Sequence, residues 1–246
     1  MDSLTITAAG GMRARLESLD LLANNISNAA TAGYKADREF YGLYISEDAA
    51  SDAADGGADA LRLPVVERNW IDHAQGAVTL TGNSMDLALS GKGFFSVNGP
   101  SGPLYTRDGG LRVSALGVVE SRNGYPVRTE GGGQIKAEPG IPLEFKADGS
   151  VFQEGQPLGR LELSDVTKPE FLAKEGGNYF RLVDPAGLTK APSVQVVQGG
   201  LEASNSGPAE SAIRLVNVLR QFEMLQRAVA MGTEMNKKAV EEVARP

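Results

Sequence analysis

The sequence SGPAESAIRLVNVLRQFEMLQRAVAMGTEMNKKAVEEVA, residues 206–244, carries the strongest structural signal in the chain. Ser206 or Gly207 suits the position before a helix, and Pro208 suits its first turn. Apolar residues follow mostly three or four positions apart, which is the spacing of one helical face: Leu215, Leu219, Phe222, Leu225, Val229, Met235, Ala239 and Val243. The pattern predicts a helix over 209–244, about 54 Å long at the usual rise per residue.

A second helix is predicted at the N-terminus, over residues 3–28. This stretch has no proline, and Thr31-Ala32-Gly33 supplies a stop signal behind it. Its apolar residues form a narrow stripe, close to the seam of a coiled coil: Leu4, Ala8, Met12, Leu16, Leu19, Ala23 and Ile26. The pair Gly10-Gly11 weakens this helix by about 1 kcal/mol per glycine.

The long C-terminal helix has one apolar stripe, and that stripe needs a partner along its whole length. One interpretation is that the helix packs on its own domain. The other is that it pairs with the N-terminal helix and with neighbouring subunits. The predicted assembly interface then consists of two stripes: Leu4, Met12, Leu16 and Leu19 near the N-terminus, and Leu215, Leu219, Phe222, Leu225 and Val229 near the C-terminus.

Between the helices, from Leu63 to Gln198, the pattern changes to short apolar or alternating runs. Dipeptides that suit hairpin turns separate them, among them Asp108-Gly109, Asn123-Gly124 and Asp148-Gly149. Many short strands at this spacing favour an irregular β-barrel or sandwich. Residues 47–60 are mostly Ala, Asp, Ser and Gly, which is typical of a flexible linker.

The predicted fold is therefore mainly β with long terminal helices. Residues 1–35 and 206–246 are expected to form a coiled-coil-like helical assembly domain. Residues 36–62 are expected to be a flexible linker. Residues 63–205 are expected to form a β-rich domain inserted between the two helices.

The composition makes several classes of partner poor candidates. The formal net charge is −7 and the pI is about 4.9, so the surface repels phosphate backbones and no nucleic-acid partner is expected. No run approaches 18 consecutive apolar residues, so membrane insertion is not expected. The chain has no cysteine. It begins Met1-Asp2-Ser3-Leu4 without a basic region, so we expect no cleaved signal peptide.

A search for catalytic chemistry gives no positive signal. His73, beside Asp72, is the single histidine, and no Gly-x-Ser-x-Gly motif accompanies it. The stretch Gly91-Lys92-Gly93 begins like a dinucleotide loop but leads into strand-like residues. No histidine or carboxylate cluster has metal-ligand spacing. We therefore expect no catalytic residue, no cofactor and no metal. A secreted enzyme such as a glycosidase, and a surface-binding adhesin, stay as alternatives.

A family resemblance lies where the N-terminal helix ends. The runs LANNISN (residues 22–28) and TAGYK (residues 31–35) resemble the N-terminal signature of the flagellar rod and hook axial proteins. The signature marks these positions of the chain: Asn24, Asn25, Asn28, Thr31, Gly33, Tyr34 and Lys35. Asparagines bond exposed backbone where a helix ends, and Gly33 permits the turn that follows.

Further blocks agree with the same family in order along the chain: DLALSGKGFF (86–95), YTRDG (105–109), LEASN (201–205) and RQFE (220–223). The residues support a structural role for them. Adjacent Phe94 and Phe95 point to opposite faces of a strand, and Arg107 is expected to pair locally. The chain departs from the family pattern after Asn205, where valine is usual and Ser206 stands.

The resemblance implies a structural subunit of the flagellar basal-body rod, not an enzyme. It implies export by the flagellar type III apparatus without signal cleavage. Polymerisation in the periplasm would follow, with other rod subunits and with copies of itself, in a helical array that transmits torque to hook and filament. Chain length is most similar to the proximal rod members. The alternatives within the family are a distal rod or a hook-type protein.

Overall fold

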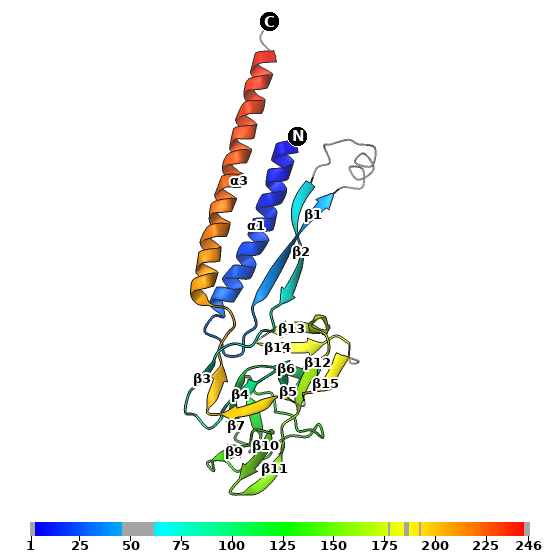
Figure 1. Cartoon of the computed structure of the whole chain (residues 1–246), viewed down its shortest axis with the longest axis vertical. Coiled ribbons are helices and arrows are strands. Elements are labelled where there is room, and N and C mark those ends of the chain that lie inside the picture. The colour runs from blue at the N-terminus through cyan, green and yellow to red at the C-terminus, as the bar shows by residue number, and fades with distance from the viewer. Residues whose placement is uncertain (1–2, 46–61, 177, 185–186, 192, 244–246) are drawn as a thin grey trace. The chain divides into compact units, whose positions relative to one another are not determined.

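The computed structural model describes residues 3–45, 62–176, 178–184, 187–191 and 193–243 (Figure 1). The chain divides into two compact units. The helical unit contains residues 1–27, 37–70 and 207–246, and the β unit contains residues 28–36 and 71–206. The prediction of a mainly β protein with a helix near each end is confirmed.

The two helices lie side by side within the helical unit (Figure 1). Helix α1 spans Ser3–Ser27 and helix α3 spans Pro208–Val243, within one residue of their predicted bounds. Strands β1 (Asp37–Ile45) and β2 (Arg62–Ile71) pair with each other. The flexible linker expected over 36–62 is therefore partly strand, and its Ala-Asp-Ser-Gly stretch at 47–60 lies outside the described residues.

The side of α3 that packs against α1 differs in one position from the predicted stripe. Its covered residues step alternately by four and three positions: Ser211, Leu215, Val218, Phe222, Leu225, Val229 and Gly232. Val218 is 8% exposed, whereas the predicted Leu219 is 42% exposed. Consecutive residues of a helix lie about 100° apart, so only one of this pair can face the partner helix. The alternating steps place Val218, and not Leu219, on the side of α3 that faces α1.

The covered side of α1 consists mostly of small residues: Ala8, Gly11, Ala14, Ser18, Leu22 and Asn25. The predicted stripe is rotated away from it, since Leu16 is 49% exposed and Met12 and Leu19 are half-buried. Leu4 lies in the first turn of α1. Small side chains allow helix axes to come closer, so large residues of α3 are accommodated opposite them. The helix runs unbroken through Gly10 and Gly11.

The β unit is built from antiparallel pairs of short strands. Their bounds are β3 (Val78–Leu80), β4 (Asp86–Ser90), β5 (Phe94–Gly99), β6 (Gly102–Thr106), β7 (Gly109–Val113), β8 (Val119–Ser121), β9 (Leu143–Phe145), β10 (Ser150–Gln153), β11 (Gln156–Arg160), β12 (Leu163–Val166), β13 (Leu172–Gly176), β14 (Tyr179–Leu182), β15 (Leu188–Lys190), β16 (Gln195–Gln198) and β17 (Gly200–Glu202). A 3₁₀ turn, η1 (Pro169–Phe171), precedes β13.

These strands form several open sheets. The largest has the order β13-β14-β6-β5-β12-β15, and a second has the order β16-β4-β7-β8. Smaller sheets have the orders β11-β10-β9 and β17-β3. Within the described residues no sheet closes on itself, so the strands do not form a closed barrel there. Asp148-Gly149 joins β9 to β10 as predicted, whereas Gly109 opens strand β7 instead of forming a turn.

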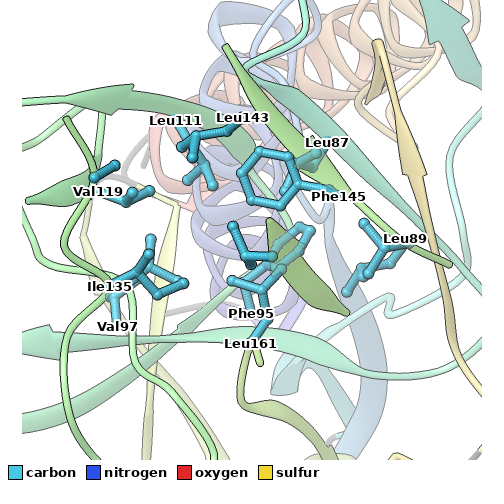
Figure 2. Packing of buried hydrophobic residues seen from close by; sticks show 14 of the residues in the cluster. Leu87, Leu89, Phe95, Val97, Leu111, Val119, Ile135, Leu143, Phe145 and Leu161 are labelled. Atoms are coloured by element: carbon cyan, nitrogen blue, oxygen red, sulfur yellow. The ribbon is translucent and has the colours of Figure 1, made fainter. Parts of the chain in front are cut away.

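Two apolar clusters fill the β unit. The larger one contains Leu87, Leu89, Phe95, Val97, Leu111, Val119, Ile135, Leu143, Phe145 and Leu161 (Figure 2). The smaller one contains Phe94, Tyr105, Leu172 and Phe180. Phe94 and Phe95 thus belong to different clusters, which confirms that they point to opposite faces of β5. Strand β5 therefore lies between the two clusters and contributes a side chain to each.

Candidate functional site

Three buried charged side chains meet inside the β unit, and each comes from a different motif. Glu202 and Lys35 are fully buried, and Arg107 is 3% exposed. Lys35 Nζ donates to Glu202 Oε1 at 2.5 Å and to the carbonyl of Ala74 at 2.7 Å. Arg107 Nη1 donates to Glu202 Oε2 at 2.9 Å, and its Nη2 donates to the carbonyl of Gly91 at 2.6 Å. We call Lys35, Arg107 and Glu202 the ion cluster.

The ion cluster lies where the chain enters and leaves the β unit. Residues 31–36, the first segment, run beside residues 200–206, the last segment. The amide of Gly33 donates to the carbonyl of Glu202 at 2.7 Å, and the amide of Ala36 donates to Asn205 Oδ1 at 2.8 Å. Asn205 Nδ2 also donates to the carbonyl of Asp72 at 2.6 Å. Hydrogen bonds therefore join the two ends of the β unit directly.

Gly33 brings the first segment against the block at 105–109. Its φ is +68°, in the left-handed region that favours glycine. A Cβ there would lie 2.3 Å from the amide nitrogen of Asp108 and 2.4 Å from the carbonyl carbon of Arg107. Only a residue without a side chain fits so close to another backbone. The TAGYK and YTRDG motifs are therefore in direct contact.

Burial sets the electrostatics of the ion cluster. It lowers the pKa of the Lys35 ammonium, because desolvation disfavours the charged form, while the hydrogen bond that Lys35 donates to Glu202 opposes this effect. Two cations share one carboxylate, whose oxygens also accept the amide of Gly76 at 2.9 Å. Removing the carboxylate would leave two buried cations without a counter-charge, which is the costly way to break a buried ion pair.

His73 lies beside this cluster in an apolar setting. Its ring meets the rings of Phe94 and Phe180 edge to face, at centroid distances of 5.8 and 5.5 Å. In the described part of the chain neither ring nitrogen has a hydrogen-bond partner. Burial, together with the nearby positive charge of Lys35, lowers the pKa of His73 to about 4.

The position of His73 predicts acid sensitivity. Its pKa is about 4 in the folded protein and 6.5 when exposed, so the unfolded state binds more protons. Stability is full above pH 6.5 and falls as the pH drops toward 4, by about 2 kcal/mol at pH 5. Chemical denaturation at pH 7 and pH 5 measures this loss. A His73→Leu variant should lose less stability than the parent over this interval, and an equal loss in both proteins would contradict the prediction.

The remaining motif residues hold local structure. Two hydrogen bonds connect Asn25 to Asp37. Asn25 Nδ2 donates to the carbonyl of Asp37 at 2.8 Å, and the amide of Asp37 donates to Asn25 Oδ1 at 3.0 Å. Asn25 therefore connects the end of α1 to β1. Thr31 Oγ1 donates to Asn28 Oδ1 at 3.3 Å. Tyr34 is buried with Lys174 Nζ 4.6 Å from its ring centre. Asn24 lies exposed on α1.

The sequence pattern missed how these motifs fit together. Arg107 was expected to pair locally, but its partner Glu202 is 95 residues away. Glu202 and Asn205 belong to a quoted block, and no periodicity marks them as partners of the N-terminal motif. The sequence signal that could have identified the ion cluster was the presence of charged residues inside blocks that otherwise consist of core and turn residues.

A second feature lies on α3, on the side away from α1. Four large apolar residues are 60–70% exposed there: Ile213, Met224, Met231 and Met235. Their spacings of eleven, seven and four residues are close to whole numbers of helical turns, so they form one stripe. We call these four residues the outer stripe.

Known proteins match the chain along most of its length. A family model described as the flagellar hook protein FlgE/F/G D1 domain matches residues 88–154, and one described as flagella basal body rod protein matches residues 7–35. The flagellar basal-body rod protein FlgF of Caulobacter vibrioides is 33% identical over 232 residues, which are 92% of this chain and 92% of that protein. The chain belongs to the flagellar basal-body rod protein family. Rod proteins are structural, so the expectation of a rod subunit and not an enzyme is confirmed.

Other rod proteins match at similar coverage. FlgF of Mesorhizobium japonicum is 30% identical and covers 90% of this chain and 89% of its own length. FlgG of Bacillus subtilis is 29% identical and covers 94% of this chain and 90% of its own length. Both cations of the ion cluster lie in matched regions, since the rod-protein match ends at Lys35 and the D1-domain match includes Arg107. In the described residues, neither helix of this rod protein is long and apolar enough to cross a membrane.

Proposed function

We propose that this rod subunit polymerises in the periplasm through its terminal helices and forms part of the shaft that transmits torque to hook and filament. The observation that carries the proposal is that α3 has two apolar sides, of which α1 covers one. Its partners are then other rod subunits and further copies of itself in a helical array. Such contacts are heterologous, because one patch meets a different patch on the next subunit.

The outer stripe lies opposite the side that α1 covers. Ile213 is two residues from Leu215, Met224 is two from Phe222, and Met231 is two from Val229. Two residues correspond to about 200° around a helix, so each pair points to opposite sides. A long helix covered on one side and apolar on the other fits a position between its own partner helix and a neighbouring subunit. The alternating four and three steps facing α1 support coiled-coil-like packing there.

Charged residues flank the outer stripe. Lys238 lies 3.0 Å from Glu234, and Arg214 lies 3.3 Å from Glu210, both as exposed pairs one helical turn apart. Exposed pairs of this kind contribute little stability, about 0.3–0.5 kcal/mol each. Their contribution here is to keep the flank polar, so that the apolar contact surface of α3 stays narrow and directional.

The resemblance to rod proteins supports the remaining parts of the proposal. These are delivery by the flagellar type III export apparatus and the absence of a cleaved signal peptide. A proximal rod position is the first candidate and a distal one the second, and relatives named FlgG match as well as those named FlgF in coverage. The length of rod that forms in a strain lacking the subunit separates the two positions, and complementation with this chain should restore the full rod.

The outer stripe gives a direct test of assembly. Met231→Asp places a charge on the stripe, and desolvation of that charge in a subunit contact costs several kcal/mol. We expect a soluble, folded variant that does not restore a rod or motility to a strain lacking the subunit. Motility and electron microscopy of basal bodies measure the result.

The matched control is Ala230→Asp, which introduces the same charge at an exposed position on the polar flank. Circular dichroism checks that both variants keep their helices. The control should restore motility. If Met231→Asp supports full motility at normal protein levels, the outer stripe is not an assembly surface. If both variants fail equally, a charge anywhere on α3 is harmful, and the stripe has no special role.

A further inference from the structure

We infer that the β unit completes its fold only when its last segment, residues 200–206, joins its first segment, residues 31–36. On this inference the ion cluster is the closing contact, and the core cannot persist with the last segment detached. The inference concerns folding within one chain. It goes beyond the proposed function and holds whether or not the outer stripe mediates assembly.

The last segment supplies hydrogen-bond partners to several distant parts of the β unit. Glu202 gives the carboxylate to Lys35 and to Arg107, which precede it by 167 and 95 residues. Its carbonyl accepts the amide of Gly33. Asn205 accepts the amide of Ala36 and donates to the carbonyls of Asp72 and Ala74. Three parts of the sequence that lie far apart thus form hydrogen bonds with the seven residues of the last segment.

Detaching the last segment would leave the interior with uncompensated charge. Among the described residues, Lys35 would keep only the carbonyl of Ala74 as a hydrogen-bond acceptor, and Arg107 only that of Gly91. Arg107 also lies beside the smaller apolar cluster, since its guanidinium is 5.4 Å from the Phe94 ring centre. Buried cations without a counter-charge destabilise a fold strongly. Opening of the last segment should therefore coincide with unfolding of the whole β unit and not occur as a separate local event.

This arrangement has a consequence for when folding occurs. A chain made from its N-terminus presents Lys35 early and Arg107 next, while Glu202 comes only after strands β3 to β16 are complete. The strongest contacts of the ion cluster are thus among the most distant in sequence, and such contacts form late because loop closure must precede them. The β unit is built to stay open until nearly all of it is available.

Native-state hydrogen exchange on the full-length Glu202→Gln variant tests the inference. Glutamine keeps the shape of the side chain and removes its charge. Protection should fall at least 100-fold in strands β5 and β6, and by the same factor in residues 31–36 and 200–206, because one opening event exposes all of them. Loss of all protection in β5 and β6 also supports the inference. Loss confined to residues 31–36 and 200–206, with β5 and β6 unchanged, overturns it, as does unchanged protection throughout.

Two further variants sharpen this experiment. Glu175→Gln removes the same charge from an exposed pair with Arg181, 2.9 Å apart, and should leave protection unchanged. Asn205→Ala removes three hydrogen bonds of the last segment and no charge. It should lower protection less than Glu202→Gln, yet uniformly over β5, β6 and the two segments. A purely local loss in Asn205→Ala contradicts the inference even if Glu202→Gln does not fold. These readings use the isolated protein, so they stand apart from the motility test of the outer stripe.

Discussion

Gly33→Ala is expected to destabilise the β unit by about 3 kcal/mol or more, a substantial part of the roughly 5–15 kcal/mol by which a typical domain is stable. Two effects add at this position. An alanine at a φ of +68° costs about 1–2 kcal/mol on conformational grounds. Its Cβ would also lie 2.3 Å from the amide nitrogen of Asp108, where backbone cannot move aside easily. The resulting shift would pull Arg107 away from Glu202.

Gly82→Ala separates the two effects. Gly82 has a similar φ of +74°, but no atom lies within 4 Å of the place a Cβ would occupy. It should therefore show the conformational cost alone, about 1–2 kcal/mol. Denaturant unfolding followed by the fluorescence of the tyrosines, which are numerous in the β unit, gives both free energies. Equal losses in the two variants would mean that close contact between the TAGYK and YTRDG motifs is unimportant for stability.

The helices could be predicted from sequence because their signals are local. Pro208 and the three-to-four spacing of apolar residues placed α3 within one residue of its observed bounds. The short alternating runs likewise indicated strands, and adjacent Phe94 and Phe95 indicated a strand with one ring on each face, which the two apolar clusters confirm. Each of these features depends on residues close together in the chain. Periodicity is sufficient evidence for such features.

The features that could not be predicted depend on pairs far apart. The order of strands in the sheets, and the contact of Arg107 with Glu202, follow from how distant segments meet. The covered side of α1 was also missed, because large apolar residues were taken as the buried ones. The structure instead buries Ala14 and Ser18, while Leu16 is half exposed. Which side of a helix is buried depends on the partner helix as well as on the helix itself.

Phe222→Asp and Leu219→Asp test which residues of α3 hold α1. The sequence pattern placed both in one seam, whereas the structure covers Phe222 and leaves Leu219 42% exposed. A charge at position 222 has to lose water to stay between the helices, at a cost of several kcal/mol. We expect Phe222→Asp to separate α1 from α3, while the β unit keeps its own unfolding transition because its two apolar clusters are complete without the helices.

Hydrogen exchange of the amides in α1 distinguishes the two variants. Most of the stability of a helix in a protein comes from tertiary packing of its apolar side, so α1 should lose protection once α3 no longer covers it. Phe222→Asp should therefore abolish protection over residues 8–25, and Leu219→Asp should preserve it. Because both changes add the same charge to the same helix three residues apart, their difference reports only the direction in which each side chain points. Equal loss of protection in the two variants would show that both residues face α1, and would favour the seam with Leu219 that periodicity alone predicts.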